Sequence, residues 1–259
     1  MYPVIVCIAK KEHDYIEEFV KYHLALGFKY IYLYDNEDTP IYQSLLHKYE
    51  DKIKVIHLPF NNYDEAVQYV ALDDFIKKYL FTSKITHVAH IDIDEYIVLK
   101  KHKNICDFIN EYIVGDCQGI GINWRFFGSS GRTKKTNEPT TIRFTMCQKK
   151  GNPHIKTLFK KDNFIKFIDC HHVTFSKGYT KSTKNTIITG PLNDIIDFDI
   201  IQLNHYKCKT LNEFRNIRER GRADIIGNII ENIDDNFKIY NINEIEDLHA
   251  YNFYKKIIY

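Results

Sequence analysis

The sequence predicts an α/β protein with a mostly parallel central sheet flanked by helices. In the first hundred residues, short apolar runs alternate with segments whose apolar residues recur at helical spacing. Alternation of this kind is typical of parallel strands joined by helices that cover both faces of the sheet. Polar side chains follow three of the predicted strands, at the edge where open α/β sheets bind ligands.

The first strand and helix follow directly from the amino terminus. The run from Val4 to Ala9 is apolar and has the length of a buried strand. Helical spacing then continues through residues 16–23, after a capping box that Asp14 and Glu17 would form. Gly27 is placed to end this helix.

Three further strands complete the first half. The runs 30–34 and 53–58 predict the second and third strands, and an apolar run leads into Asp92 as the fourth. Between them we expect a helix with Pro40 at its first position, and a longer helix over 64–80. The first hundred residues therefore predict the order β-α-β-α-β-α-β.

The remainder of the chain predicts a mixed half. Its expected elements are a helix over 105–114, strands over 119–124 and 200–206, short strands within 142–176, a helix from Thr210 to Gly221, and a helix near 244–256. We therefore expect one domain over 1–224, with a binding half at 1–100 and a second half at 101–224, and a helical extension at 225–259.

Composition restricts the classes of protein to which this chain can belong. The net charge is +2, with 36 basic against 34 acidic residues, which excludes nucleic acid as the main partner. No apolar run reaches the roughly 18–20 residues of a membrane helix. The apolar start resembles a first strand more than a signal peptide. The 6 cysteines are scattered without a Cys-x-x-Cys pair, which indicates reduced thiols. These features predict a cytoplasmic protein.

The motif with the clearest chemistry is Asp92-Ile93-Asp94-Glu95, at the end of the fourth strand. Crowded carboxylates repel one another unless a cation lies between them. Hard oxygen ligands suit Mg²⁺ or Mn²⁺, which keep positions open for the phosphate oxygens of a substrate. A strand that ends in solvated turn residues would explain the same acids.

Two other groups of residues have both a functional and a structural interpretation. Trp124 precedes a Gly/Ser-rich turn, which suits a sugar-binding loop or equally a core Trp beside an ordinary loop. The histidines His171, His172 and His205 are candidate ligands that could complete a divalent site, although a lone His is usually structural.

The ordered set of motifs resembles glycosyltransferase family 2 and family 92-like proteins, from about residue 4 to residue 224. The segments that carry the resemblance are Ile8-Ala9-Lys10-Lys11-Glu12, Tyr22-His23, Gly27, Tyr34-Asp35-Asn36, Ile91-Asp92-Ile93-Asp94-Glu95-Tyr96, Trp124-Arg125-Phe126-Phe127-Gly128-Ser129-Ser130-Gly131, His154-Ile155-Lys156, His171-His172, His205-Tyr206, Phe214 and Arg220-Gly221-Arg222. The chain departs from the family at Arg132, where a His is common.

The resemblance implies a GT-A fold with a Rossmann-like sheet, a nucleotide-sugar donor with a UDP leaving group, and Mn²⁺ or Mg²⁺. The metal ligands it implies are Asp92, Asp94 and His205. The donor-binding residues are Ala9, Lys10, Glu12, Asp35, Gln68 and Asp92. The acceptor-binding residues are Trp124, Phe127, Gly128, Ser129, Lys156, His171 and His172.

The expected reaction is metal-dependent transfer of a hexose from a UDP-sugar to a hydroxyl of a glycan or other acceptor, with inversion. UDP-galactose and UDP-glucose are favoured by the resemblance. Inversion needs a general base, for which Glu138 and Asp169 are candidates and ordinary surface acids the alternative. The competing functions are a non-catalytic module that binds a glycan or nucleotide-sugar, and a nucleotidyltransferase.

The helix after His205 is rich in arginine. A solvated helix face is the ordinary explanation of such a charge run. A donor diphosphate, however, carries more negative charge than one divalent ion neutralises beside two aspartates. We therefore expect Lys207, Arg218 or Arg222 to face the diphosphate.

Overall fold

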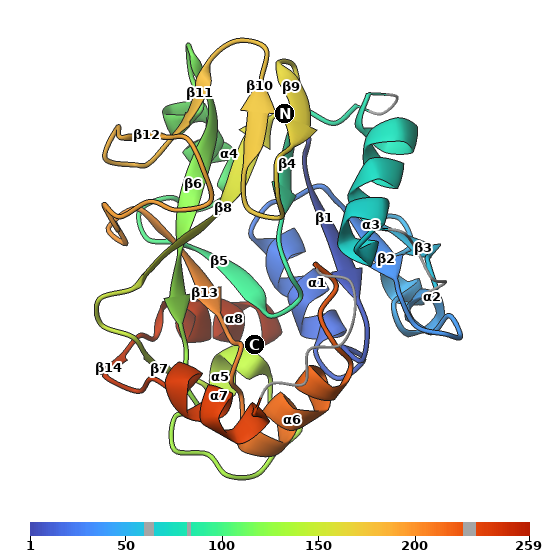
Figure 1. Ribbon diagram of the computed structural model, residues 1–259, viewed down its shortest axis with the longest axis vertical. Helices are drawn as coiled ribbons and strands as arrows, with labels where there is room; N and C mark the ends of the chain where they lie inside the picture. The colour runs from blue at the N-terminus through green and yellow to red at the C-terminus, as the bar shows by residue number, and fades with distance from the viewer. Residues whose placement is uncertain (60–64, 82–83, 225–231) are drawn as a thin grey trace.

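The computed structural model describes residues 1–59, 65–81, 84–224 and 232–259 (Figure 1). Its centre is a ten-stranded sheet. The main path runs β12 (Ile187–Ile188), β11 (Tyr179–Lys181), β6 (Cys117–Phe126), β8 (Asn152–Lys160), β4 (His87–His90), β1 (Pro3–Ala9), β2 (Tyr30–Asp35) and β3 (Ile53–His57). Strand β13 (Ile201–His205) branches from β6 and pairs with β5 (Glu95–Leu99).

The amino-terminal half of the sheet is parallel. Strands β4, β1, β2 and β3 pair in parallel, with Val4 opposite Tyr30 and Ile31 opposite Ile53. Strand β1 is buried along nearly its whole length, which is why its sequence is a continuous apolar run. The predicted order of four strands is confirmed.

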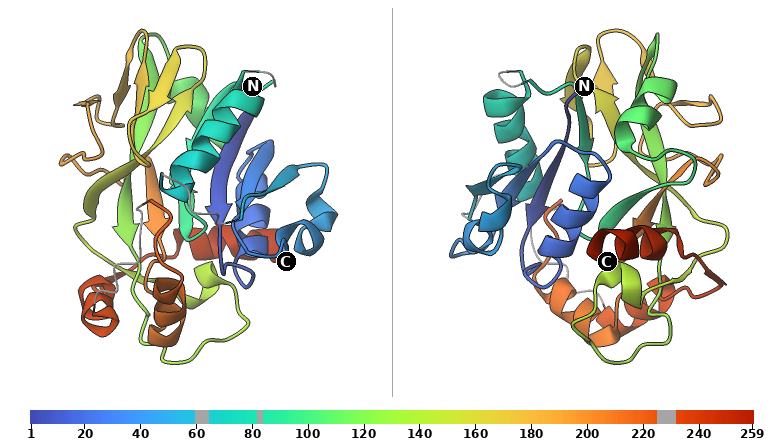
Figure 2. Two further views of the ribbon diagram at one scale, coloured as in Figure 1. Left: turned by 45° about the vertical axis from the view of Figure 1, so that its right-hand side comes forward. Right: turned by 180° about the vertical axis from the view of Figure 1, so that it is seen from behind.

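Helices cover both faces of this half (Figure 2). One core packs α1 (Ile16–Ala25), α4 (Ile105–Tyr112) and α8 (His249–Ile258) against the sheet. A second core, on the opposite face, holds α3 (Val67–Phe75) and the π-helical turn η2 (Ile76–Leu80). The predicted class, a mostly parallel α/β sheet flanked by helices, is confirmed.

The second half of the sheet is mixed, as the sequence predicted. Strand β8 is antiparallel to both β4 and β6, whereas β13 is parallel to β6 and antiparallel to β5. This pairing places His205 beside Glu95 on one side and Phe126 on the other. The smaller elements are α5 (Thr140–Arg143), β7 (Met146–Cys147), β9 (Phe164–Phe167), β10 (Val173–Phe175) and β14 (Ile245–Glu246).

Two predicted helix starts were wrong. The residue before α1 is Tyr15, without a side-chain cap, because the Asp14 carboxylate pairs instead with Lys135. Helix α2 (Tyr42–Leu45) begins after Pro40, and the 3₁₀ turn η1 (His47–Tyr49) follows it. The carboxylate of Asp35 accepts hydrogen bonds from the backbone amides of Ile41 and Tyr42, so a residue on β2 caps this start. The predicted start of the third helix, Asp64, lies outside the described residues.

The carboxyl-terminal part is helical. Helix α6 (Leu211–Glu219) begins with a capping box between Thr210 and Glu213. Helices α7 (Ile233–Tyr240) and α8 lie within the predicted extension, and Ala250 and Tyr254 of α8 belong to the main core. The division of the chain at residue 224 stays a prediction. None of the described helices is long and apolar enough to cross a membrane. All six cysteines are free.

Candidate functional site

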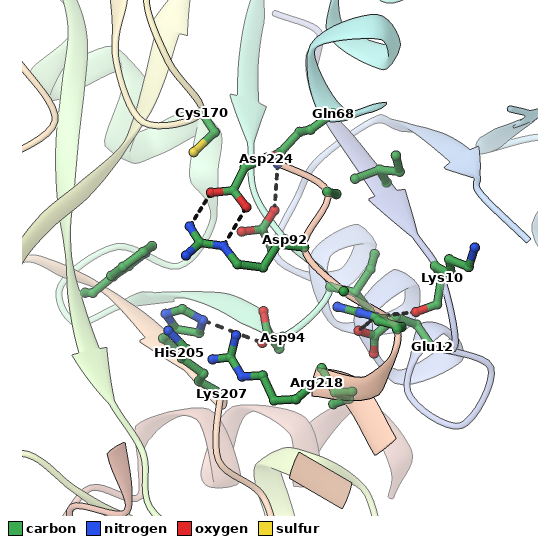
Figure 3. Close-up of a pocket in the computed structure, with 18 of the residues that line it drawn as sticks. Lys10, Glu12, Gln68, Asp92, Asp94, Cys170, His205, Lys207, Arg218 and Asp224 are labelled. Atoms are coloured by element: carbon green, nitrogen blue, oxygen red, sulfur yellow. Dashed lines mark hydrogen bonds and ion pairs between the residues drawn. The ribbon is translucent and has the colours of Figure 1, made fainter. Parts of the chain in front are cut away.

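A cavity of about 690 Å³ opens at the carboxyl ends of β1, β4 and β13 (Figure 3). Its walls come from both halves of the sheet, from the start of α3 and from the segment that follows α6. Of the predicted site residues it is lined by Lys10, Glu12, Gln68, Asp92, Asp94, Trp124, His171, His205, Lys207, Arg218 and Arg222. The fold thus brings together residues separated by two hundred positions in the chain.

The turn of residues 92–95 between β4 and β5, called the acidic turn below, is stabilised by Glu95. The backbone amide of Glu95 donates to the Asp92 carbonyl over 3.0 Å, and Oε2 of Glu95 accepts from the Asp92 amide over 2.9 Å. Glu95 is fully buried, so it supports the turn and leaves the cavity wall to Asp92 and Asp94.

The Asp92 carboxylate is held by two side chains. Oδ1 accepts from Nε2 of Gln68 and Oδ2 from Nζ of Lys156, each over 3.1 Å. Although burial favours the neutral acid, the Lys156 ammonium lowers the pKa of Asp92. Lys156 is only 1% exposed and does not line the cavity, so it acts on Asp92 from within the fold.

The Asp94 carboxylate faces His205 in the cavity wall, with 3.5 Å between Oδ2 and Nε2. Burial opposes ionisation of Asp94, but His205 and the nearby cations lower the pKa of its carboxyl. Burial lowers the pKa of His205 and so favours the neutral imidazole, the form that binds metals.

Asp94 and His205 offer ligand atoms that suit a divalent cation. Mg²⁺ in phosphate-binding sites commonly takes one or two protein ligands and fills its remaining positions with water and phosphate oxygens. Within the described residues no three His, Cys, Asp or Glu side chains cluster as a complete metal site. Asp94 and His205 would therefore hold an ion jointly with a bound ligand.

Cationic side chains form a further part of the cavity lining, called the cationic wall below. Lys207, Arg218 and Arg222 all line the cavity, and Figure 3 shows Lys207 and Arg218 beside Asp94. Burial and the neighbouring Arg218 lower the pKa of Lys207 to about 8. The Lys207 ammonium also lies 3.9 Å from the centroid of the Tyr240 ring.

The segment after α6 crosses the cavity. Arg220 donates to the carbonyl of Lys10 and pairs with the Glu12 carboxylate. The Ala223 carbonyl accepts from the Gln68 amide over 2.9 Å. Residues 220–223 are therefore bonded to the end of β1 and to the start of α3. Sequence reasoning gave Arg220 no role, because its partner Glu12 lies 208 positions away.

Imidazoles surround Trp124. The centroid of its ring lies 5.0 Å from those of His154 and His171, and 4.5 Å from that of His205. Trp124 is only 9% exposed, so most of its ring is covered by its neighbours. His154 was not predicted as a site residue, and its position in the His154-Ile155-Lys156 segment was the only signal.

Several predicted donor and acceptor residues lie behind the cavity wall. Ala9 is buried in β1, and Asp35 caps α2. Phe127 packs on Tyr206, with ring centroids 4.7 Å apart, and the Ser129 amide donates to Asn241. Gly128 is packed so tightly that a Cβ would lie 2.5 Å from the Ile242 carbonyl oxygen. His172 is buried as well.

The two predicted catalytic acids also lie outside this cavity. Glu138 lines a separate cavity of about 330 Å³ and pairs with Arg132 over 3.0 Å. Asp169 accepts hydrogen bonds from the backbone amides of His171 and His172. It therefore holds the histidine pair in place.

Two solved structures show a low similarity to this chain. TarS 1-349 from S. aureus is 16% identical, covers 62% of this chain and 47% of its own, and has a TM-score of 0.36. HddC from Yersinia pseudotuberculosis is 12% identical over 75% of this chain and 96% of its own, with a TM-score of 0.40. This chain thus aligns with about half of TarS 1-349. No curated protein matches the sequence.

The sequence profile of glycosyltransferase family 92 matches residues 2–241. The protein is therefore of the glycosyltransferase class, in agreement with a cavity that sets paired carboxylates against cations. The chain belongs to glycosyltransferase family 92, and the resemblance seen in its motifs is confirmed.

Proposed function

We propose that this protein transfers a hexose from a UDP-sugar, UDP-galactose or UDP-glucose, to a hydroxyl of a glycan or other acceptor, with inversion and with Mn²⁺ or Mg²⁺. The observation that carries the proposal is that carboxylates and cations line the same cavity. Its lining includes Asp92 and Asp94 together with the cationic wall of Lys207, Arg218 and Arg222. The choice between the two sugars rests on the family alone.

The cations supply the part of a donor site that binds a diphosphate. Arginine can donate two parallel hydrogen bonds to phosphate oxygens, and a lysine ammonium adds a compact charge. These three side chains would hold the diphosphate and favour its departure. Asp94 and His205 would hold the divalent ion, which when bound neutralises charge on the leaving group.

The nucleoside end of the donor would lie toward β1 and α3. Lys10, Glu12 and Gln68 line that part of the cavity, and Arg220 and Ala223 join its two sides. Ala9 and Asp35 would act indirectly, by shaping the strand ends behind it.

Calorimetry with UDP, in the presence and absence of Mn²⁺, tests donor binding. We expect the affinity to rise with the metal in the parent and much less in Asp94→Ala. UDP release from UDP-galactose and UDP-glucose should be lost in Asp92→Ala and Asp94→Ala. Asp199→Ala, at an exposed position that pairs with Lys184, is the matched control.

Each competing function predicts a different result. Full turnover by either aspartate variant would overturn the proposal. Metal-dependent UDP binding with no turnover of either donor would favour a binding module. Release of pyrophosphate instead of UDP would favour a nucleotidyltransferase.

A further inference from the structure

The imidazole of His154, on β8, is held in one tautomer. Oδ1 of Asn152 accepts from the backbone amide of His154 over 3.0 Å and lies 2.8 Å from the ring atom Nδ1. A backbone N–H can only donate, which identifies the Asn152 atom as the amide oxygen. That oxygen in turn requires a proton on Nδ1, and the lone pair is therefore on Nε2.

Nε2 of His154 is free of partners in the part of the chain that the structure describes. The ring stacks on Trp124 at an interplanar angle of 19°, and the residue lines the cavity and is half-buried. The charged groups that act on its pKa are Lys207, His205 and Asp169, and the titratable ring of His171 lies 5.5 Å away, centroid to centroid. Burial, then Lys207 and His205, lower the pKa of His154 below 6.5, against a smaller opposite effect of Asp169. The imidazole is thus neutral at pH 7.

The carboxylates that line the cavity are all engaged among the described residues. Their partners are Arg220 for Glu12, Lys156 for Asp92, His205 for Asp94 and Arg222 for Asp224. Asp92 and Asp224 have both carboxylate oxygens bonded. Oε2 of Glu12 has no partner among the described residues but is buried, and Asp94 is assigned to the divalent ion in the proposed function.

The other imidazoles of the cavity are poorer bases. His205 faces Asp94, as described above. Nδ1 of His171 donates to the Ile155 carbonyl over 2.8 Å, which also leaves Nε2 unprotonated. Burial, however, lowers the pKa of His171 to about 4, and a base is most effective when its pKa lies near the working pH.

We propose that Nε2 of His154 is the general base of this site. It would accept the proton of the acceptor hydroxyl as the hydroxyl oxygen bonds to the anomeric carbon. The bond from that carbon to the diphosphate oxygen breaks, and UDP leaves with the electron pair. The Nδ1 proton stays on the Asn152 side, so Asn152 is a positioning residue. The proposal rests on the transfer reaction proposed above.

Nitrogen-15 NMR of the histidine side chains tests the tautomer without any activity measurement. Above pH 6.5 we expect His154, assigned by its loss in His154→Gln, to carry its proton on Nδ1 with Nε2 unprotonated. In Asn152→Ala both tautomers should become populated. A proton on Nε2 in the parent would overturn the assignment.

Kinetics test the role in transfer. With UDP-galactose as donor, and water or methyl β-galactoside as acceptor, His154→Gln should lower UDP release by about 100- to 10,000-fold. Its Kd for UDP should stay within about twofold of the parent's, because His154 does not serve the donor. The rate of the parent should also fall as the pH is lowered, because His154 becomes protonated. The residual rate of His154→Gln should not show this fall at acidic pH.

His47→Gln is the matched control. Its Nδ1 lies 3.0 Å from the Ser44 carbonyl in the same kind of bond, on the exposed surface away from the cavity. If the parent turns over either donor and His154→Gln retains the full rate, the base assignment alone fails. If the parent binds UDP and releases none from UDP-galactose or UDP-glucose, the proposed function fails and the base assignment with it.

Discussion

The ammonium of Lys156 lies 3.1 Å from Oδ2 of Asp92 and 3.8 Å from Oε2 of Glu95. Burial opposes a charge on Lys156, yet the two carboxylates raise the pKa of its ammonium. The acidic turn therefore has an internal counter-ion supplied by β8. This keeps Asp92 ionised and oriented before any ligand arrives.

Removal of that counter-ion should destabilise the fold. Lys156→Met leaves two carboxylates without their buried partner, and we expect a loss of about 3–5 kcal/mol in the free energy of unfolding. Urea denaturation at pH 7 measures it. Lys160→Met, on the same strand with a half-exposed partner in Asp162, should cost at most about 1 kcal/mol. Equal losses in the two variants would contradict an internal counter-ion.

The cationic wall should determine the affinity for UDP. Hydrogen bonds to charged groups are worth about 1.5–3 kcal/mol, so Arg218→Met or Lys207→Met should weaken UDP binding by about 10-fold or more. Arg215→Met, on the same helix but paired with the exposed Asp234, is the control and should bind as the parent does. Calorimetry compares the three. If variants of Lys207, Arg218 and Arg222 all bind UDP with the Kd of the parent, these side chains do not contribute to UDP binding.

The pair between Arg143 and Glu213 should make stability depend on pH. Their side chains are nearly fully buried, with 2.7 Å from Nη2 to Oε1. Burial opposes ionisation, but the bonds from Arg143 and Thr210 lower the pKa of Glu213 from 4.5 to about 2. A depressed folded-state pKa gives stability that is present above about pH 4.5 and is lost as the pH falls toward 2.

Glu213→Gln should therefore be less stable than the parent by about 3 kcal/mol at pH 7, and by progressively less as the pH falls from about 4.5 toward 2. Urea unfolding at several pH values measures the difference. Glu219→Gln, at an exposed position on the same helix, should follow the parent at every pH. A deficit that stays constant between pH 7 and pH 3 would contradict the coupling.

Gly128 should tolerate no side chain. A Cβ there would lie 2.5 Å from both the Ile242 carbonyl oxygen and Oδ1 of Asn243. Gly128→Ala should cost about 1–3 kcal/mol and lower the Tm. Gly190→Ala, where nothing lies within 4 Å, should melt like the parent. If Gly128→Ala keeps the Tm of the parent but loses transfer activity, tight packing does not explain the need for glycine. That result would favour the predicted contact between Gly128 and the acceptor.

The fold class and the acidic turn were readable from the sequence because both are local patterns. A buried parallel strand such as β1 is a continuous apolar run, and Asp92 and Asp94 follow their strand directly. Helix starts were less readable where the cap is remote, as with Asp35 and α2. Family motifs and the arginine-rich run extended the prediction to 11 of the 25 residues that line the cavity.

Tertiary structure alone decided which partner each of those residues has. Lys156 was predicted to contact the acceptor, but the antiparallel pairing of β8 places its ammonium beneath Asp92. Arg220 donates a hydrogen bond to Glu12, 208 positions away in the chain. His154 of β8 stacks on Trp124 of the neighbouring strand β6. Charge and tautomer depend on such contacts, which arise from packing between distant segments and leave no periodic trace in the sequence.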